Sequence, residues 1–211
     1  MALPRRRREQ GRRPRRGTAA HLDPGADMTL HSSLHPGISR IHGSGIIALA
    51  DIPLGTALWA PCPRCRVMDT SSQRTAPPAV IDWLHEYGYR RADAGLLTPC
   101  HGAHLFNHSC RPAVLDLGLS VGIAVADIRQ GEEVCCDYRT FRFDEPWAFA
   151  CSCGTPVCEG GVESSRRRIP DRLAQEWRTR IGAALEAAGR VPQEIMIRAG
   201  DINGREGRES A

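Results

Sequence analysis

Three short pieces between residues 104 and 158 constrain this chain more than any other part of its sequence. Residues 107–112 are Asn-His-Ser-Cys-Arg-Pro, residues 131–138 are Gly-Glu-Glu-Val-Cys-Cys-Asp-Tyr, and residues 151–158 contain three cysteines. A polar turn with a cysteine is thus followed by a turn that ends in a lone tyrosine, and then by a compact thiol group. Each piece alone could be accidental, so their order and spacing carry the information.

The length and composition favour one domain with a packed core. The chain has 211 residues, of which 41% are hydrophobic, which suffices for a single domain with a spare tail. No run approaches the 18 or so apolar residues of a membrane span, and the N-terminus lacks the apolar segment of a secretory signal. We therefore expect a cytoplasmic chain with no membrane partner. In that compartment the nine cysteines are expected to be thiols or metal ligands rather than disulfides.

The positive charge is concentrated at the N-terminus. All 28 basic residues are arginine, and residues 1–27 hold eight of them against three acids, a net charge of +5. The remaining residues are close to neutral. Residues 1–27 are predicted to be a disordered Arg-rich arm, which either binds nucleic acid or precedes a true start at Met28. The near-neutral remainder argues against nucleic acid as the main partner.

Apolar patterning predicts short strands and two helices. Strands are predicted over residues 46–50, 56–59, 96–97, 105–106, 115–128 and 134–138. Residues 60–77 are expected to form a loop, and residues 200–211 a frayed tail. A first helix is predicted over 78–91, and its expected buried face is Val80, Ile81, Leu84 and Tyr87. A second is predicted over 170–188, and its apolar positions are Leu173, Trp177, Ile181 and Leu185.

The three pieces, together with a Gly43-Ser44-Gly45 triplet, resemble the four motifs of SET-domain protein lysine methyltransferases, in the family's order. The resemblance covers about residues 38–161. It implies a mainly β fold with short helices, β-clip-like, with a knot-like threaded segment and a post-SET zinc cluster. The domain boundaries that follow are a SET domain at 34–147 with an insert at 61–98, a post-SET segment at 148–162, and a C-terminal helix and tail at 166–211.

The resemblance also implies a reaction, the transfer of a methyl group from S-adenosyl-L-methionine to a lysine amine of a protein substrate. A lysine amine has a pKa of about 10.4, so the site must lower that pKa by desolvation and by the nearby sulfonium. Tyr138 matches the family's catalytic tyrosine, whose hydroxyl orients the amine. The alternative for Tyr138 is an ordinary core tyrosine with a satisfied hydroxyl.

The predicted cofactor contacts come from three parts of the chain. Gly43, Ser44 and Gly45 match the family's cofactor loop, where glycine permits close backbone approach. Asn107 and His108 match residues that meet the two ends of the cofactor, although Asn107 could instead cap a polar turn. Tyr138, and Phe149 just before the thiol group, complete the predicted cofactor-binding set: Gly43, Ser44, Gly45, Asn107, His108, Tyr138 and Phe149.

The thiol group is predicted to hold a structural zinc ion. Such a site needs four ligands in a tetrahedron, and Cys151, Cys153 and Cys158 supply three. The resemblance implies Cys110 as the fourth. The alternative is a set of inert buried thiols.

A second Cys-x-x-Cys, Cys62 with Cys65, lies outside the family's motifs. It is expected to be a loop with two free thiols, and metal binding with Cys100, His101 or His104 is the alternative.

Two departures from the family pattern affect the predicted site. Ala113 stands where the family usually has asparagine, which weakens the hydrogen bonding of the turn. Cys136 stands where the family usually has an aromatic residue, and we expect it to enlarge the substrate channel. These departures leave open the hypothesis of an inactive SET-like module that binds a peptide. The Arg-rich arm leaves open a second one, a zinc-stabilised nucleic-acid binder. The substrate protein and the oligomeric state are not indicated by the sequence.

Overall fold

The structure is a computed structural model that describes residues 30–60, 65–90, 95–98, 102–116, 121–140, 147–163 and 169–197. The predicted arm at 1–27 and tail at 200–211 lie outside these ranges. The described chain is built mainly from short antiparallel strands with a few helices, which confirms the predicted fold class. Within it, no helix has the length and apolar character needed to span a bilayer.

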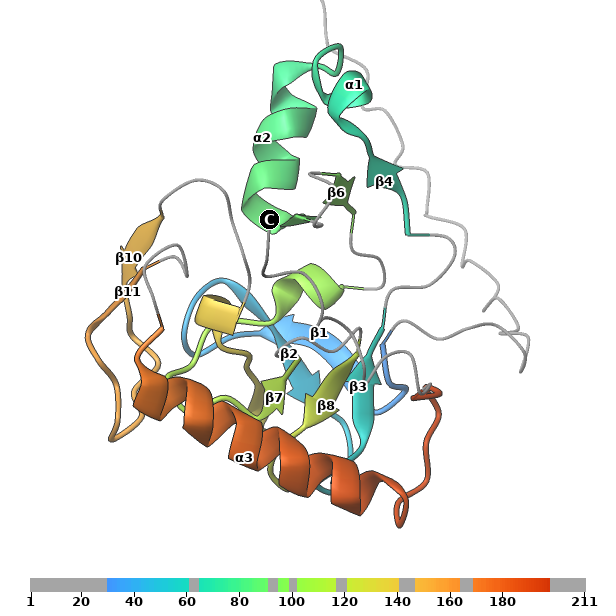
Figure 1. The fold of residues 1–211 in the computed structure, drawn as a ribbon, viewed down its shortest axis with the longest axis vertical. Helices are drawn as coiled ribbons and strands as arrows, with labels where there is room; N and C mark the ends of the chain where they lie inside the picture. The colour runs from blue at the N-terminus through green and yellow to red at the C-terminus, as the bar shows by residue number, and fades with distance from the viewer. Residues whose placement is uncertain are drawn as a thin grey trace, which may run out of the picture.

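Two three-stranded sheets form the centre of the molecule (Figure 1). The first has the order β1-β2-β9, with strands Leu34–Ile38, Ser44–Ala48 and Glu133–Val134. The second has the order β3-β8-β7, with strands Ala57–Trp59, Gly122–Ala124 and Val114–Leu115. Their inward apolar side chains include Ile46, Leu58, Val114 and Val134, all at 1% exposure or less, and they join in one core cluster.

The C-terminal helix α3, Asp171–Ala188, runs across the second sheet (Figure 1). Its predicted apolar face is confirmed, because Leu173, Trp177 and Ile181 are buried and pack with Leu115 and Ile123 of the sheet. The residues after α3 return to the N-terminal half of the chain. Gln193 there accepts a hydrogen bond from the Ala57 amide at 2.8 Å, which extends the packed domain beyond the predicted helix.

A separate group of small elements, residues 65–90 and 95–98, stands apart from the two sheets (Figure 1); we call it the insert lobe. It contains β4 (Val67–Met68), α1 (Thr70–Gln73), α2 (Pro78–Tyr87), β5 (Tyr89–Arg90) and β6 (Leu96–Leu97), with sheet order β4-β6-β5. The loop predicted over 60–77 was therefore wrong at β4 and α1. These elements have two and four residues, too few to give a periodic pattern.

Helix α2 begins at Pro78 as predicted, but it ends at Tyr87, short of the predicted residue 91, and β5 follows it. Of the predicted buried face, Leu84 is confirmed, whereas Val80 and Tyr87 were wrong. Leu84 is 2% exposed, whereas Val80 is 41% and Tyr87 is 36% exposed. The cause is the size of the lobe. A sheet made of two-residue strands covers about one turn of a helix and leaves the other apolar positions at the surface.

Two 3-10 turns occupy part of the ranges predicted as strands. Residues 105–106 were predicted as a strand, but Ala103–Leu105 forms the turn η1. Gly102 begins it with a φ of 85°, in the left-handed region where glycine is favoured. The strand predicted over 134–138 ends early, and Tyr138–Thr140 forms the turn η2.

Two segments that are distant in the sequence lie side by side at the centre of the fold. We call residues 107–114 and 133–140 the paired segments. The Ser109 amide donates to the Cys136 carbonyl at 2.9 Å, and the Cys136 amide donates to the Asn107 carbonyl at 3.0 Å. His108 and Cys136 form a parallel bridge. The first two sequence motifs are therefore in direct contact, and the knot-like threading stays a prediction.

Candidate active site and thiol cluster

Tyr138, the predicted catalytic residue, is held at both its hydroxyl and its backbone. Its hydroxyl donates a hydrogen bond to the Phe106 carbonyl at 3.0 Å, and its amide donates to His108 Nδ1 at 3.2 Å. Burial raises the pKa of Tyr138 above its ordinary value of 10, so the phenol is neutral at physiological pH. A neutral hydroxyl that donates to a carbonyl can accept a hydrogen bond at its oxygen, which suits an orienting group.

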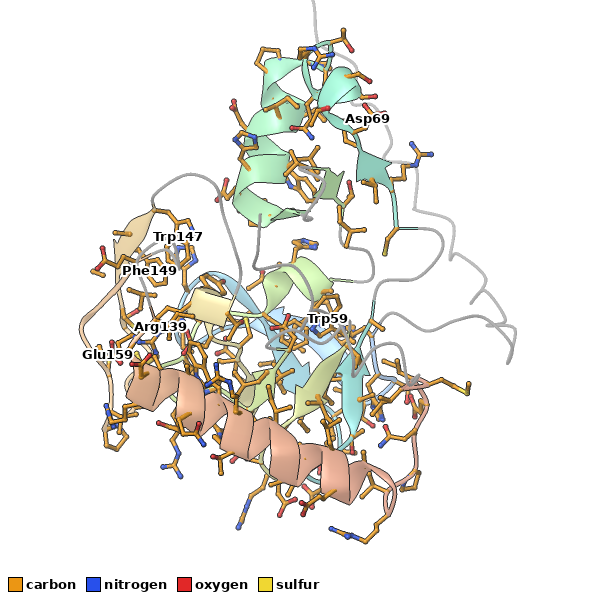
Figure 2. The ribbon with its side chains drawn as sticks, in the orientation of Figure 1. Trp59, Asp69, Arg139, Trp147, Phe149 and Glu159 are labelled. Atoms are coloured by element: carbon orange, nitrogen blue, oxygen red, sulfur yellow. The ribbon has the colours of Figure 1, made fainter. Side chains whose placement is uncertain are left out.

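Three rings from two other parts of the chain lie around Tyr138, and Figure 2 labels two of them, Trp147 and Phe149. The centroid of its ring lies 5.6 Å from that of His108 and 5.8 Å from that of Phe149. Trp147 stacks on Phe149 at 5.9 Å. Phe149 belongs to β10, Ala148–Ala150, which pairs with β11, Gly161–Glu163. The sequence reasoning missed Trp147, although its position two residues before Phe149 was a usable signal.

Asn107 joins the predicted cofactor loop to the paired segments. Its side-chain amide lies 3.0 Å from the Ser44 carbonyl and 2.8 Å from Glu133 Oε1. It also lies within 3.2 Å of the His42 carbonyl and of Ser39 Oγ. Because an amide has two N–H groups for these four acceptors, both of its donors are engaged inside the protein. Its NH2 group therefore pins the loop, as in the capping alternative, and its contact with a cofactor stays a prediction.

Glycine is required at position 45 because the side chains of Glu133 and Asn107 approach its Cα closely. A Cβ at Gly45 would collide with the Glu133 carboxylate and lie 3.2 Å from Asn107 Nδ2. Gly43 has a φ of 51°, a conformation that also favours glycine. Ser39 and Glu133 complete the arrangement, since the Ser39 hydroxyl donates to Glu133 Oε1 at 2.7 Å. Neither was predicted as a site residue, and Ser39 stands in no motif.

His108 connects Tyr138 to the thiol cluster. Its Nδ1 accepts the Tyr138 amide hydrogen, so the ring proton belongs on Nε2, which lies 3.4 Å from Cys110 Sγ. Burial lowers the pKa of His108, and Asp137 opposes that shift. A neutral imidazole in this tautomer can donate a hydrogen bond to the cysteine sulfur. One ring thereby links the predicted catalytic turn to a predicted metal ligand.

A buried ion-pair network surrounds the same turn. The Arg139 guanidinium donates to both Asp137 oxygens, at 2.9 and 2.8 Å, and to Glu159 at 2.7 Å. Asp137 is fully buried. Although burial opposes it, these bonds raise the pKa of Arg139. Figure 2 shows Arg139 between the centre of the fold and the segment that carries Glu159. The network joins η2 to the residue beside Cys158.

The four predicted zinc ligands converge. The sulfur atoms of Cys110, Cys151, Cys153 and Cys158 all lie within 4.8 Å of one another. The Cys110 and Cys151 sulfurs are 3.8 Å apart, close to the edge of about 3.8 Å that a tetrahedron with Zn–S bonds of about 2.3 Å requires. The donor set therefore fits a zinc ion, and within the described residues no second such group is found.

The thiols of this cluster are not equivalent. Burial raises the pKa of Cys151 to about 12. Burial also opposes ionisation of Cys153, yet hydrogen bonds, chiefly from the Thr155 hydroxyl at 3.3 Å, lower its pKa to about 6. Thiolates are the form that binds metal. Of these two thiols, Cys153 therefore ionises to the metal-binding form more readily.

Cys136, predicted to line the substrate channel, is 7% exposed within the core cluster. Its sulfur lies 3.8 Å from the Phe106 carbonyl, the group that accepts the Tyr138 hydroxyl. It is thus a neighbour of the Tyr138 hydroxyl site. Its role in a channel stays a prediction.

Of the second Cys-x-x-Cys, Cys62 lies outside the described residues, as do Cys100 and His101, and Cys65 is half-buried. His104 packs edge-on against Trp83 and Tyr87 of α2, at 5.6 and 5.7 Å. Metal binding by this group is therefore not indicated by the part of the chain that the structure describes.

Residues 43–139 match the SET domain family. This segment begins at the predicted cofactor loop and ends one residue after Tyr138, so it contains both paired segments up to η2. The match therefore falls on the segment whose motifs resemble the SET-domain family.

Among known proteins, the chain is similar to histone-lysine N-methyltransferase ATX2 of Arabidopsis thaliana, with 40% identity over 70 residues. The matched segment covers 30% of this chain and 6% of that protein. Among solved structures, KRYPTONITE in complex with mCHG DNA and SAH has a TM-score of 0.46 at 19% identity, covering 63% of this chain and 29% of that one. The methyltransferase domain of human SETMAR has a TM-score of 0.45 at 18% identity, with 62% and 58% covered. The assignment depends on the family match and on the residues above.

Proposed function

We propose that this chain is a protein lysine N-methyltransferase that uses S-adenosyl-L-methionine. The observation that carries the proposal is the placement of Tyr138 within the SET segment. Its hydroxyl donates to the Phe106 carbonyl at 3.0 Å, amid the rings of His108, Trp147 and Phe149. When bound, the cofactor supplies an electrophilic methyl group on a cationic sulfur.

The residues around Tyr138 provide what an amine nucleophile needs. The Tyr138 oxygen and the Phe106 carbonyl are both hydrogen-bond acceptors, and an amine directs its N–H groups to acceptors. Aromatic rings lie on several sides of Tyr138, and partial desolvation of an amine beside them disfavours the charged ammonium form and lowers the amine pKa. Because burial keeps Tyr138 protonated, its role is to orient the amine. It does not serve as a base.

The zinc ion is proposed to be structural. All four candidate ligands are cysteines, and structural zinc sites are closed by four such ligands. Held together, Cys110 and the cysteines after β10 would fix Phe149 and Trp147 beside Tyr138. The metal would therefore shape the pocket without taking part in the transfer.

The proposed substrate is a protein with an accessible lysine, in the cytoplasm. The relative ATX2 is named a histone-lysine methyltransferase, so basic histone peptides are the first probes. The inactive-module hypothesis is disfavoured by Tyr138, His108 and the loop at Gly43–Gly45, which are all present.

The test is transfer of isotope-labelled methyl from S-adenosylmethionine to histone peptides and to a cell lysate. The chain contains no lysine, so automethylation of its own side chains gives no background. Label on a substrate lysine supports the proposal. Cofactor binding without transfer to any peptide or lysate protein would instead support the inactive module.

A further inference from the structure

Helix α3 lies outside the SET family match, yet it contacts both paired segments. The match ends at residue 139, and α3 starts at Asp171. Most of its inward face covers the second sheet through Leu173 and Ile181. Two of its side chains reach past the sheet, and they are Trp177 and Arg180.

Trp177 supports the ion-pair network beside Tyr138. The Arg139 guanidinium lies 5.8 Å from the centroid of the indole ring, within the range of a cation–π interaction. Trp177 is 1% exposed, so it also shields the network from water. Because Arg139 holds both oxygens of Asp137, the indole fixes the residues on either side of Tyr138.

Arg180 supports the other paired segment. Its Nη2 donates to the Pro112 carbonyl at 2.6 Å, a short bond from a half-buried cation. Pro112 follows Cys110 by two residues, so this bond holds the turn that carries the fourth thiol. The two contacts are three residues apart on α3, hence on one face of the helix.

We propose that α3 is a positioning element for the active site. Through Trp177 and Arg180 it holds the Tyr138 turn and the Cys110 turn in register with each other. The inference rests on the proposed methyltransferase function for its kinetic consequence, but its structural consequence can be measured without turnover.

The first test is amide hydrogen exchange of Arg180→Met against Arg178→Met, a matched change at an exposed position of the same helix. Exchange in residues 107–114 and 133–140 should rise about fivefold in Arg180→Met alone. Exchange in β2 should stay within about twofold of wild type. Equal acceleration in β2 would mean that Arg180 acts on global stability, and would overturn the proposal. If Arg180→Met does not fold, Arg180→Lys, which keeps the charge and loses the planar fork, serves for the same comparison.

The second test is the rate at which zinc leaves the protein to a colorimetric chelator. Arg180→Met should release zinc several-fold faster than Arg178→Met, because the Cys110 turn is loosened. Equal rates in the two variants would contradict the proposed link between α3 and the cluster.

The third test separates the two contacts by kinetics. Trp177→Phe should lower kcat about fivefold with the KM for S-adenosylmethionine within about twofold, since the Tyr138 turn is displaced. Arg180→Met should chiefly raise that KM. Wild-type kinetics in both variants would sink the proposal while leaving the methyltransferase function intact. If wild-type protein transfers no methyl group, the proposed function fails, and exchange and zinc release still decide the role of α3.

Discussion

The paired segments and the insert lobe differ in how deeply their polar and aromatic side chains are buried. In the paired segments, Asn107, Asp137 and Arg139 are all at 9% exposure or less, and each has several polar partners. In the insert lobe, Trp83 and Tyr87 lie 37% and 36% exposed and pack on each other at 5.4 Å. Several buried polar contacts hold each of these residues in the paired segments, so substitutions there should strongly reduce stability or activity. The insert lobe is open to solvent, so changes there should alter contacts with a partner more than the fold.

The largest contrast is expected between two tyrosines, one in each region. Tyr138→Phe should lower kcat by about 100-fold or more, because misorientation of a reacting group costs rate steeply. The dissociation constant of S-adenosylmethionine should stay within about twofold. Tyr87→Phe in the insert lobe is the control and should keep near-normal turnover. Steady-state kinetics together with calorimetric cofactor titration measure both quantities, and a Tyr138→Phe enzyme of normal activity would remove the assigned role.

Removal of the zinc ion should have the next largest effect, a loss of cofactor affinity at the paired segments that leaves the insert lobe unchanged. One zinc per chain is expected, and Cys110→Ser should lose it as readily as Cys153→Ser does, since both sulfurs belong to one tetrahedron. A chelator should lower cofactor affinity before it unfolds the core, because the cluster closes over Tyr138. Atomic absorption after gel filtration gives the stoichiometry. Metal content that survives the loss of Cys110 would place the fourth ligand elsewhere.

The same two regions show what the sequence could and could not predict. The motif residues Tyr138, His108 and Cys110 were identified because their motifs resemble those of the SET family in the same order, and the structure brings them together. The helix at α3 was predicted because four apolar positions repeat over many turns.

The wrong predictions arose where burial or contacts depend on parts of the chain that are distant in sequence. Helix α2 has a periodic pattern that predicts a buried Tyr87, but burial depends on how much surface the rest of the lobe supplies. Ser39 was missed because its role comes from a contact across 94 residues, which no local pattern encodes, whereas Trp147 could have been found from its position two residues before Phe149. Local signals therefore indicated short strands and helices, the resemblance of the motifs to the SET family supplied the specific fold class, and the composition of the site was predicted only in part.

Within the insert lobe, neighbouring residues of α2 should behave differently. Leu84→Ala should cost about 2–5 kcal/mol of unfolding free energy, since Leu84 is 2% exposed and a cavity would remain. Trp83→Ala should cost about 1 kcal/mol or less, as a substitution at the surface. Its larger effect should be on the KM for a peptide substrate. Urea denaturation compares the two, and equal costs would mean that the exposed ring is part of the core of the lobe.

The number of methyl groups transferred should depend on Cys136. If the small side chain leaves room beside Tyr138, wild-type enzyme should carry out second and third transfers, and Cys136→Tyr should shift the product towards monomethyl-lysine. Cys135→Ser, at the adjacent buried position, is the control for disturbance of the core. Mass spectrometry of a methylated peptide decides, and a wild-type enzyme that makes only monomethyl-lysine at long times would refute the enlarged channel.

The smallest predicted effect concerns a carboxylate at the edge of the paired segments, Asp116. Desolvation raises the pKa of Asp116 from 3.8 to about 7, against a hydrogen bond from Thr140. The residue as a whole is half-buried, but its carboxyl group is withdrawn from water. The burial of the carboxyl group is what raises the pKa. Asp137 nearby has Arg139 as a partner at 2.8 Å, which offsets the cost of burying its charge.

The sign of the pH dependence follows from that raised pKa. A carboxyl group whose pKa is higher in the folded state favours folding most below its unfolded value of 3.8, and the contribution is lost as pH rises through about 7. Asp116→Asn cannot ionise, so it should match wild type near pH 4 and exceed its stability at pH 8. Solvent screening limits the gain to roughly 1 kcal/mol, or about 2–4 °C in Tm. Thermal unfolding of both proteins across this range, with exposed Asp82→Asn of α2 as the control, measures it. A constant difference in Tm at every pH would show that Asp116 ionises as readily in the folded protein as in the unfolded chain, and that the edge of the paired segments is as open to water as the insert lobe.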